Sequence, residues 1–533
     1  MNINLLYKDS DRTAPEYYYD YKNITQDLSL DTLFTAASKE IVFEVTEVKR
    51  VLEPDLYIKS VMQKVMLTPL HSREEIAYRQ DIIKDLIPKQ EVLKDIYQRV
   101  SCMLAEWDKL GRNVKGSKAG KDGMTKLITR IYELILIRDT LSYLKRTVSG
   151  MDAASEGLRS FARRLSERYS DEVEEKLSRM LDDISFFVRE SSAEGMVNRP
   201  RITVSCNIGS NGRLADFSLL ELSTHERKYR DSNSTITKLQ NYFSSLAPDV
   251  ILCGSDPDSM SQARQIEYVV VKGIVDEWDE FYREFEGFFD SLLYQLAFYR
   301  GAILLTQHMK RYGLDYCYPT VTTSDRLVFT ELKEFVMCLT QTVNPIGNTC
   351  SMEDRMLIII TGANQGGKST FLRSIGIAQV MMQCGLPVTA ERFVSGIFPN
   401  LFMHFTRRED SQMNSGRLDE ELGRMNQIVE HIGPDSLVLL NESFATTTER
   451  DGSIIAYDII RALTEAGVKV ITVTHLLSFA QRMYKESSDG DSRCGIEFLS
   501  AERMGDGRRT YRMIQNVPEL TSFGLDLYEE IIR

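Results

Sequence analysis

Apolar residues recur every three or four positions through most of the first two thirds of the chain, a spacing typical of amphipathic helices. Within 28–94 this pattern breaks at Thr68-Pro69. A new helix is predicted to begin after Ser72, which can cap it with Glu75 as its partner in a capping box. We therefore expect stacked helices here. Residues 111–123 interrupt the pattern with glycines and four spaced cations, which predict a basic loop that either contacts nucleic acid or is simply solvated.

The most regular helical pattern follows Ser155, where apolar residues line one face. They are Leu158, Phe161, Leu165, Tyr169, Val173, Leu177, Leu181, Ile184 and Val188. A single helix of this length, about 50 Å at a rise of about 1.5 Å per residue, can act as a lever or pack as one helix of a bundle. Helical spacing returns between Ile266 and Tyr312, so a second long helix is expected to run back alongside the first.

Between these two helices the period of the pattern changes to two. Apolar residues alternate over 202–208, Asn211-Gly212 is typical of a type I′ turn, and a second strand is expected over 217–222. The sequence therefore predicts a β-hairpin near 200–222.

The last third of the chain begins its regular pattern with a short apolar run, 356–361, which is typical of a buried strand. A glycine-rich loop follows it, and then a helical pattern over 371–383. The loop satisfies the P-loop pattern G-x-x-x-x-G-K-S/T with Gly362, Gly367, Lys368 and Ser369. A chance match to this pattern is rare when a buried strand and an amphipathic helix bound it, so we predict a phosphate-binding loop.

In such a loop each residue type has a chemical task. Glycines let backbone N–H groups curl around phosphate oxygens, and the start of the following helix adds the positive end of its dipole. We expect Lys368 to reach the β- and γ-phosphates of a nucleotide, and the Ser369 hydroxyl to ligate Mg²⁺. The expected nucleotide contacts are Gly362, Ala363, Asn364, Gln365, Gly366, Gly367, Lys368, Ser369 and Thr370.

Two further apolar runs end in polar residues. The run 436–440 ends at Asn441-Glu442, and a strand beside the P-loop strand would deliver Glu442 to the γ-phosphate, where it could orient or deprotonate water. The run 468–475 ends at His475, which could donate a hydrogen bond to the same phosphate. Either residue alone is a weak indication, because a lone histidine is usually structural. Their order after one P-loop makes Glu442 and His475 the catalytic candidates.

Charge and cysteine usage narrow the class of protein. The net charge of −12 excludes a polybasic nucleic-acid coat, so any contact with DNA must be local. The eight cysteines are scattered without a C-x-x-C pair, which indicates neither a zinc site nor a disulfide framework. The amino end lacks a signal-peptide pattern, and no run of 18 apolar residues occurs. We expect a cytoplasmic protein without membrane contact.

With these motifs in order, residues 331–533 resemble the ATPase domain of the MutS family of DNA mismatch-repair proteins, which belongs to the ABC-type P-loop class. The resemblance is carried by TGANQGGKSTFLRSIG, SLVLLNESFATTTERDG, VITVTH and TSFGLDL. More loosely, residues 1–330 are similar to the family's helical core and lever domain. The fold expected is thus α/β plus all-α: a long-helix domain with a hairpin insertion, then an ATPase domain.

The segment NSGRLDEEL, at 414–422, resembles the family's Ser-Gly-Arg loop, which acts like an ABC signature loop. The resemblance implies that Ser415 and Gly416 complete the nucleotide site of a second subunit, so the protein would be a homodimer with composite ATP sites. Taken alone, the segment is also a good helix start with Ser415 as its N-cap, and both descriptions can hold together.

The sequence also departs from the family pattern. No room is seen for the mismatch-reading domain, because core-like sequence begins near residue 28, and the nuclease-like domain of a bacterial paralogue is not expected after the ATPase domain. Asn441 stands where the family has an aspartate, so Mg²⁺ held by Ser369, Asn441 and Glu442 should bind weakly and hydrolysis could be slow. Gln341 precedes Asn344-Pro345 where an adenine-stacking aromatic is usual, which leaves base selectivity open.

The resemblance implies an ATP-dependent, DNA-binding MutS-like ATPase that uses Mg²⁺ and couples ATP binding and hydrolysis to closure of helical arms on DNA, in mismatch repair or in other DNA processing. The alternative is a nucleotide-gated clamp or scaffold with little turnover, acting on non-mismatch DNA, RNA or protein. A third reading, an unrelated P-loop kinase, would require arginines in a lid and an acceptor pocket in place of the Ser-Gly-Arg loop.

Overall fold

The computed structural model describes residues 4–8, 16–44, 47–51, 55–116, 123–179, 181, 201–208, 214–223, 285, 287–322, 326–341, 343–406, 416–488, 495–504 and 508–518. These residues fall into two compact units. The first is formed by the described residues of 94–152 and 159–293, and the second by those of 4–93, 153–158 and 294–533. Residue 330 lies inside the second unit, and the domain boundary expected there stays a prediction.

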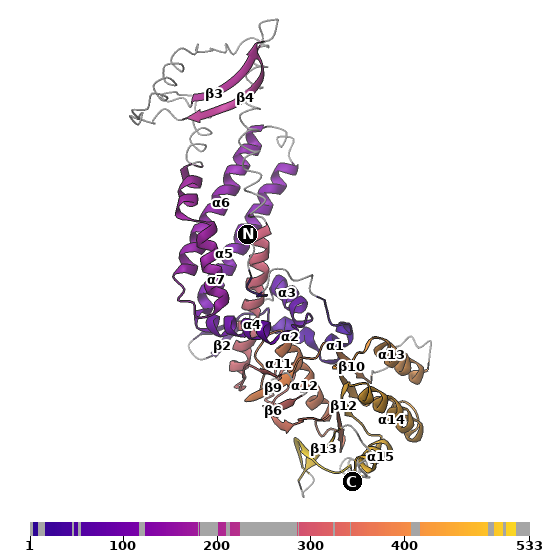
Figure 1. Ribbon diagram of the computed structural model, residues 1–533. Helices are drawn as coiled ribbons and strands as arrows, with labels where there is room; N and C mark the ends of the chain where they lie inside the picture. The colour runs from indigo at the N-terminus through magenta and orange to yellow at the C-terminus, as the bar shows by residue number, and fades with distance from the viewer. Residues whose placement is uncertain are drawn as a thin grey trace. The chain divides into compact units, whose positions relative to one another are not determined.

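Three helices supply most of the first unit: α5 (Gln90–Gly116), α6 (Gly123–Ser149) and α7 (Glu156–Arg168) (Figure 1). The basic loop predicted over 111–123 is wrong for its first part, because α5 continues through Gly116. Extending a helix adds one hydrogen bond for each residue ordered, so the two glycines near its end, Gly111 and Gly116, are tolerated. The middle of that predicted loop lies outside the described residues.

The single helix of about 50 Å predicted after Ser155 is also wrong, because α7 ends at Arg168. A second helical stretch covers 171–179, and Ser170 begins it. The Ser170 hydroxyl accepts the backbone N–H of Val173 at 3.3 Å, and its carbonyl oxygen accepts that of Glu174 at 2.9 Å. A serine side chain thus offers the backbone an alternative to a continuous helix. Ile184 and Val188 lie outside the described residues.

The predicted hairpin is confirmed. Strand β3 (Arg201–Ile208) pairs antiparallel with β4 (Leu214–Ser223), and the Asn211-Gly212 turn lies outside the described residues. Residues 287–311 are helical, as expected for the second long helix, whose predicted start at 266–284 is outside them. Strands β1 (Ile41–Glu44) and β2 (Glu47–Val51) form a small antiparallel pair that the sequence pattern did not predict.

Short helices open the second unit, as the spacing over 28–94 predicts: α1 (Tyr21–Asp27), α2 (Leu30–Ala36), α3 (Leu56–Met66), α4 (Arg73–Leu86) and the 3-10 turn η1 (Ile87–Lys89). Ser72 is the N-cap residue of α4, but its side chain accepts no backbone N–H. The Ser72 hydroxyl instead donates to the Glu74 carboxylate at 2.7 Å. The predicted capping box is therefore wrong in one part: the Ser72 side chain does not accept a backbone N–H of α4.

A six-stranded sheet forms the core of the rest of the second unit. Its order is β10 (Leu401–Phe405), β11 (Leu437–Asn441), β12 (Lys469–Val473), β8 (Leu357–Thr361), β13 (Ile496–Arg503) and β14 (Arg509–Gln515). The first five strands run parallel, and β14 is antiparallel to β13. The three apolar runs of the sequence are therefore strands, and their carboxyl ends lie at the same edge.

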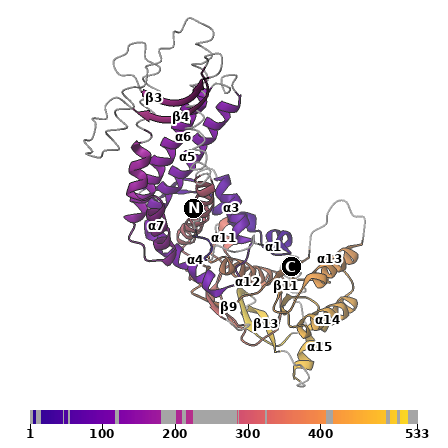
Figure 2. The ribbon, with the colours of Figure 1, turned by 45° about the horizontal axis from the view of Figure 1, so that its top comes forward.

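Helices cover both faces of this sheet, because successive strand residues point to opposite sides. Val438 and Leu440 pack into a core with helices α13 (Arg417–His431), α14 (Glu449–Glu465) and α15 (Leu477–Ser488). On the other face, α12 (Lys368–Gln383) lies so close that a side chain at Gly376 would meet Leu439. Figure 2 shows α14 and α15 side by side. The mixed helical and α/β fold is thus confirmed.

A second, smaller sheet was not predicted. It has the order β5 (Thr320–Thr322), β9 (Arg392–Gly396), β6 (Leu327–Leu332) and β7 (Asn348–Ser351), with α11 (Phe335–Gln341) between β6 and β7 in the chain. No helix among the described residues is long and apolar enough to cross a membrane.

Candidate functional site

The loop between β8 and α12 has the backbone conformation that its glycines predict. Gly362 and Gly367 have φ values of +112° and +90°, a region that residues with a side chain rarely adopt. The loop is also packed tightly against β13, where a Cβ atom added to Gly366 would lie 2.7 Å from the Cβ of Ala501. The glycines are therefore needed both for the turn and for the close approach, and they bring the loop to the amino end of α12, which favours anions.

Lys368 begins α12 and is buried, with only 4% of its surface exposed. Its Nζ donates hydrogen bonds to the carbonyl oxygens of Gly362 and Ala363, both at 2.9 Å. Burial lowers the pKa of Lys368, and the nearby Glu442 carboxylate opposes that shift. A desolvated cation surrounded by backbone dipoles is a strong binding group for an anion such as a phosphate.

The residue after Lys368 contacts the strand end that carries the predicted metal ligand. The Ser369 hydroxyl donates to the Asn441 side-chain oxygen at 2.8 Å. The two strands concerned are not neighbours, since β12 lies between β8 and β11. The prediction that the strand of Glu442 lies directly beside the P-loop strand is therefore wrong. The contact still forms, because α12 starts above the carboxyl edge of the sheet and reaches across one strand.

Glu442 and His475 lie together at the same edge. The distance from Glu442 Oε1 to His475 Nε2 is 3.2 Å, and the Glu442 backbone N–H donates to the Val473 carbonyl oxygen at 2.8 Å. The hydrogen bond from His475 holds the pKa of Glu442 below its usual value, and Lys368 acts in the same direction. Glu442 is therefore present as a carboxylate at neutral pH, as a general base must be.

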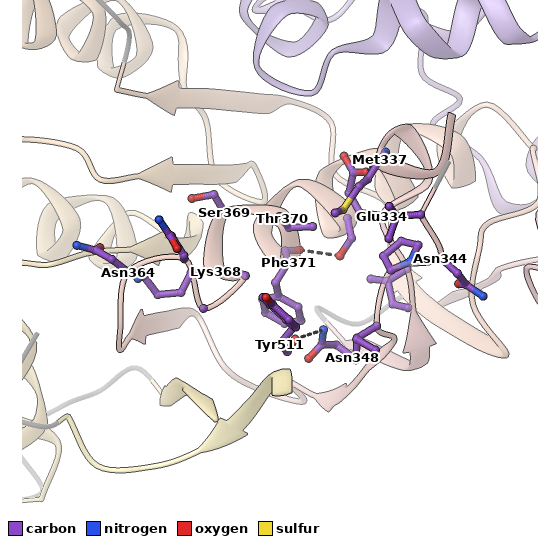
Figure 3. Close-up of a pocket in the computed structure, with 18 of the residues that line it drawn as sticks. Glu334, Met337, Asn344, Asn348, Asn364, Lys368, Ser369, Thr370, Phe371 and Tyr511 are labelled. Carbon is purple, nitrogen blue, oxygen red and sulfur yellow. Dashed lines mark hydrogen bonds between the residues drawn. The ribbon is translucent and has the colours of Figure 1, made fainter. Parts of the chain in front are cut away.

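A cavity of about 560 Å³ extends from the P-loop toward α11 and β7 (Figure 3). Its lining comprises Leu332, Glu334, Met337, Val343, Asn344, Pro345, Ile346, Asn348, Asn364, Gln365, Gly366, Gly367, Lys368, Ser369, Thr370, Phe371, Ser374, Glu442 and Tyr511. Of the predicted site residues, the seven from Asn364 to Thr370 and Glu442 line the cavity directly. Asn441 and His475 stand behind it, in contact with Ser369 and Glu442 respectively.

Tyr511 is one of the cavity residues that the sequence pattern did not predict, and it is an aromatic one. Its side chain is 47% exposed, and Figure 3 shows its ring beside Phe371 and Asn348. Asn348 holds the strand in place, because its amide donates to the Tyr511 carbonyl oxygen at 3.3 Å and accepts the Met513 N–H at 2.7 Å. The missing aromatic residue near Asn344 could have prompted a search for one elsewhere in the chain, but its position depends on the pairing of β14.

The predicted signature segment is only partly visible. Ser415 lies outside the described residues, and Gly416 is the exposed N-cap residue of α13, where it does not line the cavity. The TSFGLDL motif at 521–527 also lies outside the described residues. The expected role of Ser415 and Gly416 in a second subunit stays a prediction, whereas Ser415 as the N-cap residue is wrong, because Gly416 occupies that position.

The donor set suits a nucleotide bound with Mg²⁺. Mg²⁺ prefers oxygen ligands and usually keeps waters and substrate phosphates among them. The Ser369 hydroxyl and the Asn441 amide oxygen are such ligands and lie within 2.8 Å of each other. Among the described residues no group of three or more His, Cys, Asp or Glu side chains could hold a metal by itself. The site thus fits a cation that arrives with phosphates better than a resident ion.

Comparison with known proteins agrees with this geometry. The family model of MutS domain V matches residues 358–529, and that of the MutS2 N-terminal domain matches residues 71–312. Endonuclease MutS2 of Streptococcus sanguinis (strain SK36) is 31% identical over 162 residues, which are 30% of this chain and 20% of that protein. Endonuclease MutS2 of Halothermothrix orenii is 30% identical over 175 residues, which are 33% of this chain and 21% of that protein.

The matched region spans about a fifth of the length of these curated relatives. The two family models match successive parts of the chain in the order helical region, then P-loop region. The matched P-loop region contains Lys368, Ser369, Glu442 and His475, the side chains gathered at the edge of the sheet. The chain is a member of the MutS family.

Proposed function

We propose that the protein binds and hydrolyses ATP with Mg²⁺ and uses this cycle to act on DNA. The observation that carries the proposal is the buried Lys368 ammonium in a glycine cradle, with the Glu442 carboxylate lining the same cavity and His475 bonded to it. A cation for the phosphates and a base for water are the two groups that phosphoryl transfer to water requires. A phosphate-binding module without catalysis would need the first but not the second.

The chain's own residues divide the task of hydrolysis. Lys368 would exchange its two carbonyl hydrogen bonds for phosphate oxygens and neutralise charge as it develops. Glu442 would orient a water molecule and accept its proton, while the hydrogen bond from His475 keeps the carboxylate in place. Ser369 and Asn441 would hold Mg²⁺, which when bound neutralises part of the phosphate charge. Because Asn441 carries no charge, we expect the ion to bind weakly.

We expect Lys368→Ala to weaken ATP binding at least about 100-fold, because it removes the buried cation of the cradle. The measurement is equilibrium binding of a fluorescent ATP analogue to the full chain. Lys485→Ala on α15 is the matched control, since Lys485 is exposed, and it should bind like the wild type. Equal ATP affinity in Lys368→Ala and wild type would contradict the assignment of the cavity.

Glu442→Gln separates the ATPase from a nucleotide-gated clamp or scaffold. The substitution keeps the size of the side chain but removes the base, so we expect single-turnover ATP hydrolysis to slow by about 100-fold or more, with ATP affinity little changed. Rates of both proteins are measured with enzyme in excess over radiolabelled ATP. Equal rates for the variant and the wild type would leave only the clamp or scaffold function.

For the base of the nucleotide we propose that Tyr511 provides the stacking surface. Its half-exposed ring lines the cavity close to Gly367 and beside Phe371 and Asn348 (Figure 3). Stacking of a base on an aromatic ring contributes about 1–3 kcal/mol, so Tyr511→Ala should weaken ATP binding about tenfold. Tyr511→Phe keeps the ring and should bind ATP like the wild type. Loss of affinity in both variants, or in neither, would contradict stacking.

The family resemblance also supports proposals about assembly. We place a helical core and lever domain in 1–330 and the ATPase domain in 331–533, and two chains would pair so that Ser415 and Gly416 of one complete the nucleotide site of the other. The exposed position of Gly416 at the amino end of α13, outside the cavity of its own chain, supports a role in a second chain. Closure of the helical arms would follow from this pairing.

DNA is the partner that we propose, on the strength of family membership. Because the chain carries a net charge of −12, we expect a local contact with few phosphates. The logarithm of DNA affinity should then fall with the logarithm of salt concentration, with a slope near 0.9 for each phosphate contacted. The test is fluorescence anisotropy with duplex, mismatched and branched DNA over a salt series. Absence of binding to all three would favour an RNA or protein cargo.

A further inference from the structure

The loop that carries Glu442 has a strained backbone conformation. Glu442 and Phe444 have φ values of +56° and +65°, the left-handed region that side chains other than glycine disfavour. Such conformations persist only where surrounding contacts determine them, and they concentrate at functional sites. The position of the Glu442 carboxylate therefore depends on whatever holds the loop 441–448.

One side chain from outside the loop holds it at two points. Glu421 of α13 is buried, and its Oε1 accepts the backbone N–H of Phe444 at 3.2 Å. Its Oε2 accepts the hydroxyl of Thr446 at 2.5 Å. Both oxygens of a buried carboxylate are thus used, one on the strained residue Phe444 and one on Thr446 two residues later. A buried carboxylate is costly unless its oxygens are hydrogen-bonded, so this contact is specific to one loop conformation.

A second contact links the same helix to the same loop. His404, a buried residue of β10, donates from Nε2 to the Glu421 carbonyl oxygen at 3.1 Å. The Nδ1 atom of the same ring lies 2.7 Å from the Ser443 hydroxyl oxygen. Ser443 is the residue directly after Glu442. The backbone and the side chain of Glu421 are therefore both tied to the catalytic loop, one through His404 and Ser443 and the other directly.

Glu421 lies near the amino end of α13, so it can connect that end of the helix with the catalytic loop. The helix begins with Gly416 as its N-cap residue, so Glu421 lies in its second turn. The amino end of α13 is the part that would meet the nucleotide of a second chain, whereas the Glu421 side chain faces the catalytic loop of its own chain. A small shift or rotation of α13 would move both hydrogen bonds of the loop together.

We infer that Glu421 is a positioning residue that couples engagement of the amino end of α13, at Gly416, by a second chain to the placement of Glu442 for hydrolysis. The inference rests on the proposed function and deepens it, because it names the route by which pairing of two chains controls turnover. Glu421 does not line the cavity. It acts through the backbone of the loop.

The experiment compares Glu421→Ala, Glu421→Gln and Glu420→Ala in the full chain. We expect Glu421→Ala to slow single-turnover ATP hydrolysis about 100-fold, since a misplacement near 1 Å can have that effect, while ATP affinity stays within about twofold. Glu421→Gln should recover most of the rate, because its oxygen can still accept the Phe444 N–H and its amide can donate to Thr446. Glu420→Ala, which removes an exposed carboxylate from the same helix turn, should hydrolyse ATP like the wild type.

A double-mutant cycle tests the coupling itself. Gly416→Val, which adds a side chain where the backbone and the space around it tolerate one, should slow hydrolysis by blocking that engagement. Added to Glu421→Ala it should have little further effect, because both substitutions interrupt one route. Multiplying effects would overturn the inference, as would a normal rate in Glu421→Ala or an equal loss of ATP affinity and rate. If wild type does not hydrolyse ATP at all, the proposed function fails. If Glu442→Gln abolishes turnover and Glu421→Ala does not, the inference alone fails.

Discussion

The buried ammonium of Lys368 is the constraint on which the rest of the site depends. An isolated cation cannot be removed from water without partners, and here two loop carbonyl oxygens and the nearby Glu442 carboxylate supply them. The loop must therefore curl back on itself, which requires glycine at the turn positions. The loop must also lie against β13, and this close packing leaves no room for a side chain at position 366, which is why Gly366 is there. The ability of the loop to bind an anion such as phosphate and the local fold of the loop thus both follow from the same buried charge.

The parallel sheet brings the remaining groups to that charge. Strands β8, β11 and β12 end at one edge, so Ile360, Asn441 and Val473 occupy the same level although they are far apart in the sequence. Ser369 reaches Asn441 across the intervening strand, and His475 follows the end of β12 closely enough to contact Glu442. The catalytic candidates therefore come from separate segments, whose proximity depends on sheet order.

The same edge contains strained backbone that neighbouring elements hold in place. The positive φ values of Glu442 and Phe444 are maintained by hydrogen bonds from β10 and α13, and that of Tyr511 lies beside the two hydrogen bonds of Asn348. Strain at these points means that the positions of a carboxylate and an aromatic ring can respond to movements of other elements.

The sequence by itself determined the P-loop, the three buried strands around it, the hairpin and the helical character of the first part, because glycine spacing and apolar periodicity act over a few neighbouring residues. It also singled out Lys368 and Ser369, which complete the P-loop pattern, and Glu442 and His475, which come just after recognisable strands. It could not determine that β12 separates β8 from β11, that the helix after Ser155 breaks at Ser170, or that Tyr511, Glu421 and His404 belong with the site. Those facts depend on pairing and burial between distant segments, and only the tertiary structure decides which of many compatible contacts form.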